Sequence, residues 1–203
     1  MNFLIHCTLA NDVADNLAAD TELRTGLIAG GVIGDFVKGP VNTAWPEALQ
    51  NGVRLHRKID ALSNQDLAIR RLSATFPPHL RRFAPIFLDL LADHALAKDW
   101  SQHYDFARRE FSQGCYAAID EYAAYMPAGG MKFLTYMREQ DLLGNYHEWD
   151  HIRRATQSVL RRLKRLELTS AAESAMQATL PATADELQGL LERLRQGSGE
   201  VVS

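Results

Sequence analysis

The sequence predicts an all-α, single-domain fold. Apolar residues recur at helical spacing along almost the whole chain, for example at Val159, Leu160, Leu163 and Leu166. Strands of alternating β-branched residues joined by hairpin turns are missing, and no internal repeat is found. With 203 residues, 46% of them hydrophobic, the chain can bury one good core. We therefore expect a single helical bundle.

Proline, glycine and apolar spacing set the expected elements in order. The N-terminal part is helical and includes residues 55–60. The later helices are a segment carrying Leu62 to Leu72 that ends at Pro77-Pro78, then 83–100, 106–126, 152–168 and 184–194. The expected loops, 39–45, 76–79 and 127–131, are too short to link domains. We therefore expect one domain over residues 1–195 and a disordered tail over 196–203.

Charge and cysteine content narrow the class of protein. The net charge of −3 and the pI near 6.2 give no overall attraction to nucleic acid, so a polyanion could bind only at a local basic cluster. Cys7 and Cys115 have no zinc-type spacing and suggest free thiols in a reducing compartment. The N-terminus lacks the basic region of a signal peptide, and no apolar run reaches the roughly 18–20 residues of a membrane span. We expect a soluble, cytoplasmic protein that does not bind a membrane.

An acid and an imidazole stand side by side at Asp93-His94, inside the apolar stretch 86–100. Asp89 lies four residues earlier, so the two carboxylates share one helix face and repel each other unless a cation compensates them. That cation could be a divalent metal or an arginine, such as Arg81 or Arg82. The residues alone leave a metal or catalytic site and a buried ion-pair network both open.

Other candidate ligands lie earlier in the chain. Asp35 is surrounded by glycine and apolar residues, and His56 and Asp60 share a helix face at i, i+4. That pair could bind a metal, hydrogen-bond each other, or simply form a surface pair, and His6 alone is typical of a satisfied core histidine. Together, several Asp and His residues on separate helical segments predict a divalent site for Mn, Fe, Zn or Mg. No HExxH or GxSxG motif is present.

Four blocks in order resemble the acyl carrier protein phosphodiesterase family, also called holo-acyl-carrier-protein hydrolase. They are MNFLIH (1–6), GDFVKG (34–39), LHRKID (55–60) and RRFAPIFLDLLADHALA (81–97), and the resemblance covers about residues 1–165. It implies an HD-like helical metallohydrolase that cleaves the phosphodiester between 4′-phosphopantetheine and a serine of holo-acyl carrier protein. It also implies a divalent cofactor, typically Mn²⁺.

The resemblance also assigns roles to residues. It implies that the catalytic metal ligands are Asp35, His56, Asp93 and His94, with His6 as a further ligand. Arg57 and Lys58 are expected to contact the phosphate, beside Asp60 and Asp89; Asp89 is a ligand or, preferably, orients an imidazole.

The expected partner is strongly acidic, so a chain of net charge −3 needs a local basic surface to approach it. We expect that docking surface at Arg70, Arg71, Arg81 and Arg82 rather than at the basic helix 153–165. Two other functions stay open. One is an HD-like phosphohydrolase acting on another phosphoester, and the other is a non-enzymatic helical module that binds an acidic partner.

Overall fold

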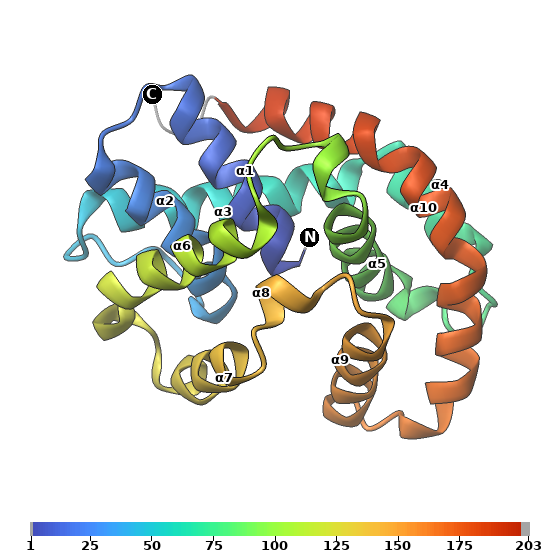
Figure 1. Cartoon of the computed structure of the whole chain (residues 1–203). Coiled ribbons are helices and arrows are strands. Elements are labelled where there is room, and N and C mark those ends of the chain that lie inside the picture. Colours follow the sequence, from blue (N-terminus) through green and yellow to red (C-terminus); the bar gives the residue numbers. More distant parts are fainter. Residues whose placement is uncertain (1, 200–203) are drawn as a thin grey trace.

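The computed structural model describes residues 2–199, and every regular element in that range is helical (Figure 1). The all-α prediction is therefore confirmed. The α-helices are α1 (Phe3–Asn16), α2 (Thr21–Ile33), α3 (Glu47–Gln65), α4 (Leu67–Thr75), α5 (Ala84–Lys98), α6 (Arg108–Glu121), α7 (Ala128–Glu139), α8 (Leu142–Asn145), α9 (Trp149–Arg162) and α10 (Thr169–Ser198). Single 3₁₀ turns include η1 (Gly34–Phe36) and η2 (Arg81–Phe83). None of the helices in the described range is long and apolar enough to cross a membrane.

Glycines bring α2 and α3 into direct backbone contact. A Cβ atom added to Gly30 would lie 2.3 Å from the carbonyl carbon of Gly52, so no side chain fits at this crossing. Close approach of this kind is a common reason for glycine inside a helix, where it otherwise costs stability. The crossing sets the C-terminal end of α2 against the middle of α3, where the candidate ligands lie.

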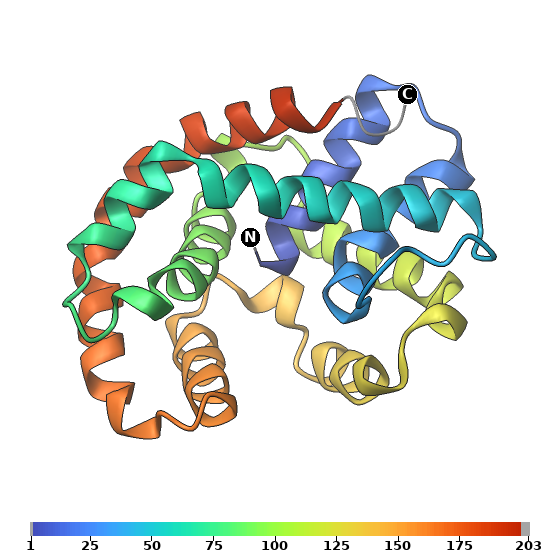
Figure 2. The same ribbon diagram turned by 180° about the vertical axis from the view of Figure 1, so that it is seen from behind.

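The start of α1 lies in the middle of the molecule, as the N-terminal label shows in both views (Figures 1 and 2). Its first turn needs acceptors for backbone amides that no helical carbonyl reaches. Asp93 of α5 supplies them, because its Oδ2 accepts from the Leu4 amide at 2.8 Å and its Oδ1 accepts from the Ile5 amide at 3.0 Å. A side chain 89 residues away from Leu4 therefore caps this helix.

The C-terminal helix is much longer than the predicted 184–194. Helix α10 runs over 30 residues and contains Pro181, which is exposed. It packs along α5 and α3, and this tertiary contact holds the helix together across the proline. The expected tail is wrong for residues 196–198, which are helical, because Ser198 is buried and donates to the Leu194 carbonyl at 2.6 Å. Residues 200–203 of that tail lie outside the described range.

Three other boundaries also differ from the prediction. The expected helix 106–126 is α6 followed by a 3₁₀ turn (Ala123–Tyr125), and the expected loop 127–131 is already α7 from Ala128 onward. Helix α9 ends at Arg162 instead of 168, where Lys164 adopts a positive φ of 55°. The loops at 39–45 and 76–79 are confirmed.

Candidate metal centre

Two buried histidines face one carboxylate at the contact between α1 and α3. The His6 Nε2 atom lies 3.1 Å from Asp60 Oδ1, and the His56 Nε2 atom lies 3.3 Å from Asp60 Oδ2. The histidine side chains are 1% and 3% exposed, whereas the Asp60 side chain is 37% exposed. The ligand atoms of the three residues all lie within 4.8 Å of one another, so they could hold one metal ion. The site is thus buried on its imidazole side and open on its carboxylate side.

Helical spacing and ring packing fix this geometry. His56 and Asp60 lie one turn apart on α3 and point the same way, while the His6 ring from α1 stacks on the His56 ring at 3.9 Å and 22°. The His56 Nδ1 atom donates to the Gly31 carbonyl at 3.0 Å, which turns Nε2 toward the site. A histidine that binds a metal through one nitrogen usually donates through the other in this manner.

The protonation states suit a cation. Burial and the neighbouring His56 lower the pKa of His6 to about 3, so its imidazole is neutral at pH 7. Burial acts to raise the pKa of Asp60, but hydrogen bonds from His56 and His6 outweigh it and hold that pKa far below its usual range. The cluster therefore combines an ionised carboxylate with a neutral imidazole, the forms that bind metals. The Nδ1 atom of His6 is buried and has no hydrogen-bond partner among the described residues.

Gly34 and Asp35 form the edge of the site. A Cβ atom on Gly34 would lie 2.5 Å from the His56 Cγ atom, so the 3₁₀ turn can pack on the imidazole only because residue 34 is glycine. That packing sets Asp35 Oδ1 3.7 Å from His56 Nε2, with 46% of the Asp35 side chain exposed. Asp35 thus stands at the solvent side of the cluster, beside the predicted partner His56.

Asp93 and His94 point to different neighbours. Both oxygens of Asp93 accept the α1 amides, and its burial raises the pKa of the carboxyl group to about 7. The His94 Nδ1 atom lies 2.8 Å from the Tyr146 carbonyl oxygen, and its ring meets Trp149 edge-on at 5.5 Å. Among the described residues, the group of possible ligands that lie close together contains neither Asp93 nor His94.

Asp60 is the carboxylate that bridges His6 and His56. Its i, i+4 spacing from His56 had predicted a shared helix face on which the two residues could bind a metal or hydrogen-bond each other. The role expected for Asp60 beside the phosphate stays a prediction. Asp89, the other acid expected at the substrate, is half-buried one turn before Asp93, and burial raises its pKa.

The basic residues near the site differ in whether their side chains already form hydrogen bonds within the protein. The Arg57 Nη2 atom donates to the carbonyls of Val37 at 3.1 Å and Gly39 at 2.7 Å, so this side chain holds the loop that follows Asp35. Lys58 is half-buried beside it on α3.

The four arginines expected at the docking surface are all exposed and lie on α4 and η2. Arg71 pairs with Glu186 of α10 at 2.8 Å. The Arg81 Nε atom donates to the Phe76 carbonyl, and Arg82 lies over the Phe83 ring. Helix α4 follows directly on α3, beyond Asp60 (Figure 2). The surface is thus close to the cluster along the chain, and one of its guanidinium groups already has an acidic partner.

The fold and this cluster define a helical protein with a candidate divalent-metal centre of two imidazoles and a carboxylate. The chain belongs to the acyl carrier protein phosphodiesterase family, whose model matches residues 1–194. It is similar to the acyl carrier protein phosphodiesterases of Escherichia coli O6:H1 (strain CFT073), O127:H6 (strain E2348/69) and K12 (DH10B). Each is 30% identical over 171 residues, which cover 82% of this chain and 81% of the relative. No solved structure matches the chain. The resemblance found in the sequence is confirmed.

Proposed function

We propose that this protein hydrolyses the phosphodiester between 4′-phosphopantetheine and the serine of holo-acyl carrier protein, releasing the apo-carrier and 4′-phosphopantetheine. The observation that carries the proposal is the Asp60 carboxylate between two stacked, buried imidazoles. It belongs to a chain whose family and relatives bear that activity in their names. The reaction belongs to fatty acid biosynthesis in the cytoplasm, in keeping with the buried free thiols of Cys7 and Cys115.

The proposed cofactor is a divalent ion, with Mn²⁺ preferred, held by His6, His56 and Asp60. Imidazole with carboxylate suits Mn²⁺, Fe²⁺ or Zn²⁺, and no thiolate belongs to the cluster. A bound ion supplies Lewis-acid activation of water and neutralises charge on the phosphoryl oxygens. Asp35, exposed and 3.7 Å from His56, either completes the ligand set or accepts the proton of the attacking water.

The remaining residues act around that centre in the proposal. Asp93 fixes the first turn of α1 and thereby the position of His6, which directly follows Ile5. His94 stays a predicted ligand through its second nitrogen, Nε2, since Nδ1 has the Tyr146 carbonyl. Lys58 is the better candidate for a phosphate contact, because the Arg57 guanidinium is already engaged by the loop after Asp35. Asp89 stays a predicted neighbour of the substrate.

One experiment tests the reaction. The protein is incubated with holo-acyl carrier protein and Mn²⁺, and the carrier is examined by mass spectrometry for loss of the phosphopantetheine group. We expect complete conversion to the apo-carrier and no conversion after chelation of the metal. Cleavage of a generic diester such as bis-p-nitrophenyl phosphate without conversion of the carrier would favour a related phosphohydrolase. Neither activity nor metal binding would favour a non-enzymatic helical module.

The carrier is proposed to dock on Arg70, Arg71, Arg81 and Arg82. Charge reversal at Arg70 and Arg71 should raise the KM for the holo-carrier several-fold and weaken its dependence on salt, while hydrolysis of a small diester stays unchanged. Charge reversal at Arg161 and Arg162, exposed on the basic helix α9, is the matched control. An effect of the control alone would move the docking surface to α9.

A further inference from the structure

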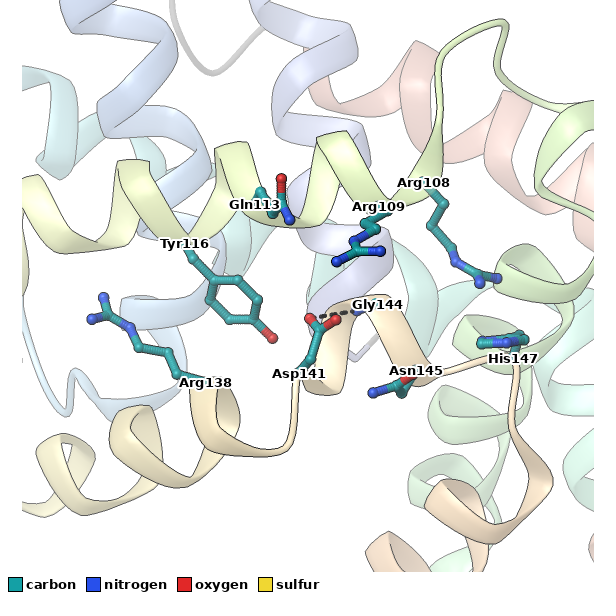
Figure 3. Close-up of a pocket in the computed structure, with 9 residues that line it drawn as sticks. All are labelled: Arg108, Arg109, Gln113, Tyr116, Arg138, Asp141, Gly144, Asn145 and His147. Carbon is teal, nitrogen blue, oxygen red and sulfur yellow. Dashed lines mark hydrogen bonds between the residues drawn. The ribbon is translucent and has the colours of Figure 1, made fainter.

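A cavity of about 460 Å³ lies between α6, α7 and α8 and is lined by residues that the metal centre does not use (Figure 3). It is lined by Arg108, Arg109, Gln113, Tyr116, Arg138, Asp141, Gly144, Asn145 and His147. The buried Tyr146 separates it from the start of α1, because the Tyr146 hydroxyl accepts from Asn2 while Asn145 and His147 line the cavity. The cavity is therefore a different site from the cluster of His6, His56 and Asp60.

The lining carries an excess of positive charge. Three arginines and one carboxylate, that of Asp141, line it, and the Glu148 carboxylate lies beside the lining residue His147. Arg138 also pairs with Asp120, whereas Arg109 is exposed and forms no ion pair with a described residue. In Figure 3 the Arg109 guanidinium hangs over Asp141 and Gly144, and Arg108 reaches down toward His147. A concave surface of this kind attracts anions.

Two guanidinium groups in this lining have a buried Nε–H donor without an acceptor. These are the Nε atoms of Arg108 and Arg138, neither of which has a hydrogen-bond partner in residues 2–199. Both side chains are nevertheless held, since Arg108 donates through Nη1 to the Ala97 carbonyl and Arg138 pairs with Asp120. Buried polar atoms are nearly always hydrogen-bonded, so fixed donors without acceptors indicate a missing acceptor.

We propose that this cavity binds a small phosphomonoester, with Arg108 and Arg109 as donors to the phosphate oxygens. A phosphate group presents three terminal oxygens in different directions and a charge close to −2, which matches the several N–H groups of two neighbouring guanidinium groups on α6. A planar carboxylate has only two oxygens to offer. The cavity volume suits a small molecule, and the flat surface of an acidic protein helix would not reach into it.

Titration of metal-free protein with inorganic phosphate and with glycerol 3-phosphate, followed by calorimetry, tests this site. We expect saturable binding of both, and about tenfold weaker binding in Arg109→Gln, a loss of about 1.4 kcal/mol, because this variant loses a charge-assisted hydrogen bond to the phosphate. Arg109 has no ion-pair partner to lose, so this variant should fold normally, as far-UV circular dichroism would show. Arg162→Gln, an exposed arginine at the end of α9, is the matched control.

Two further arms locate the site and define its chemistry. His56→Ala should leave phosphate binding unchanged, since the metal centre lies elsewhere, and malonate should bind more weakly than phosphate. Absence of saturable phosphate binding, equal binding by Arg109→Gln and wild type, loss of binding in His56→Ala, or equal affinity for malonate would each overturn the proposal. Because no arm measures hydrolysis, the outcome is independent of the proposed function.

Discussion

The molecule contains two acid–histidine pairs, His56 with Asp60 on α3 and Asp93 with His94 on α5, and they behave differently. Four residues separate the first pair, so both side chains share a face and meet His6. The second pair is adjacent, and adjacent helical residues point about 100° apart. Asp93 accordingly turns to the first amides of α1, and His94 turns to the Tyr146 carbonyl. Spacing along a helix, more than adjacency in sequence, decides which pair gathers at one point.

Both acid–histidine pairs nevertheless contribute to the cluster of His6, His56 and Asp60. His6 directly follows Leu4 and Ile5, whose amides donate to Asp93, so the α5 carboxylate fixes the backbone on which an imidazole of the cluster stands. The first pair is therefore expected to act on a ligand directly, and the second to act through the position of α1. Substitutions at the two pairs should separate metal binding from stability.

The largest effect is expected at the α3 pair. Asp60→Asn keeps the shape of the side chain and removes the charge between the two imidazoles, so its affinity for Mn²⁺ should fall more than about 100-fold, beyond the usual loss for a residue that only supports a ligand. Conversion of the holo-carrier should fall with it. The readout is the metal content after dialysis, measured by mass spectrometry. The control is His79→Ala, because His79 is exposed and lies outside the cluster. Unchanged metal content in Asp60→Asn would remove Asp60 from the ligands.

Next in size is the effect of crowding the α3 pair. Gly34→Ala places a Cβ atom 2.5 Å from the His56 Cγ atom and must displace the imidazole. A displacement near 1 Å can cost about 100-fold in rate, so turnover should fall by that order while the helical signal is kept. Gly129→Ala is the control, because a Cβ atom there meets nothing within 4 Å. Equal turnover in both variants would show that His56 need not keep its position.

At the α5 pair the expected effect is on stability. Asp93→Asn puts an amide NH₂ where an oxygen accepts a backbone N–H, and a buried donor left unsatisfied costs about 1–3 kcal/mol. Urea unfolding should show this loss, with Mn²⁺ still bound in the folded protein. Asp185→Asn, at an exposed position on α10, should change neither quantity. Loss of metal at unchanged stability would instead make Asp93 a ligand, as the family resemblance implies.

The sequence predicted much of this arrangement, and the contacts explain what it missed. Helical spacing was enough for the all-α fold and for the shared face of His56 and Asp60. It could not say that α1 would set His6 opposite Asp60, because that depends on the crossing of two helices. Nor could it foresee that Asp93 caps a helix 89 residues away. A proline inside a helix is unfavourable, in keeping with an expected helix that began at 184, after Pro181, and packing on α5 and α3 explains why α10 runs through it.

The last comparison, a pH dependence, sets Asp93 beside Asp66, which also accepts two helix-start amides, from Ala68 and Ile69. Burial opposes ionisation of Asp66, but Arg193 and the amides outweigh it and lower its pKa. The folded state therefore favours the ionised Asp66, and its contribution to stability is present above its unfolded pKa of 3.8 and is lost as the pH falls through the folded pKa.

For Asp93 the sign is opposite. Its pKa rises from 3.8 to about 7, so between these values the folded protein holds a proton that the unfolded chain has released. In metal-free protein, the difference in unfolding free energy between wild type and Asp93→Asn should therefore decline as the pH rises from 3.8 to about 7. The difference between wild type and Asp66→Asn should instead decline only on acidification. Urea titrations that extend from below pH 3.8 up to about 7 measure both differences. Repeating the urea titrations with Mn²⁺ sharpens the comparison of the two acid–histidine pairs. A cation bound to Asp93 would keep this carboxylate ionised and abolish the decline measured against Asp93→Asn. A cation held by the α3 pair alone would leave that decline in place.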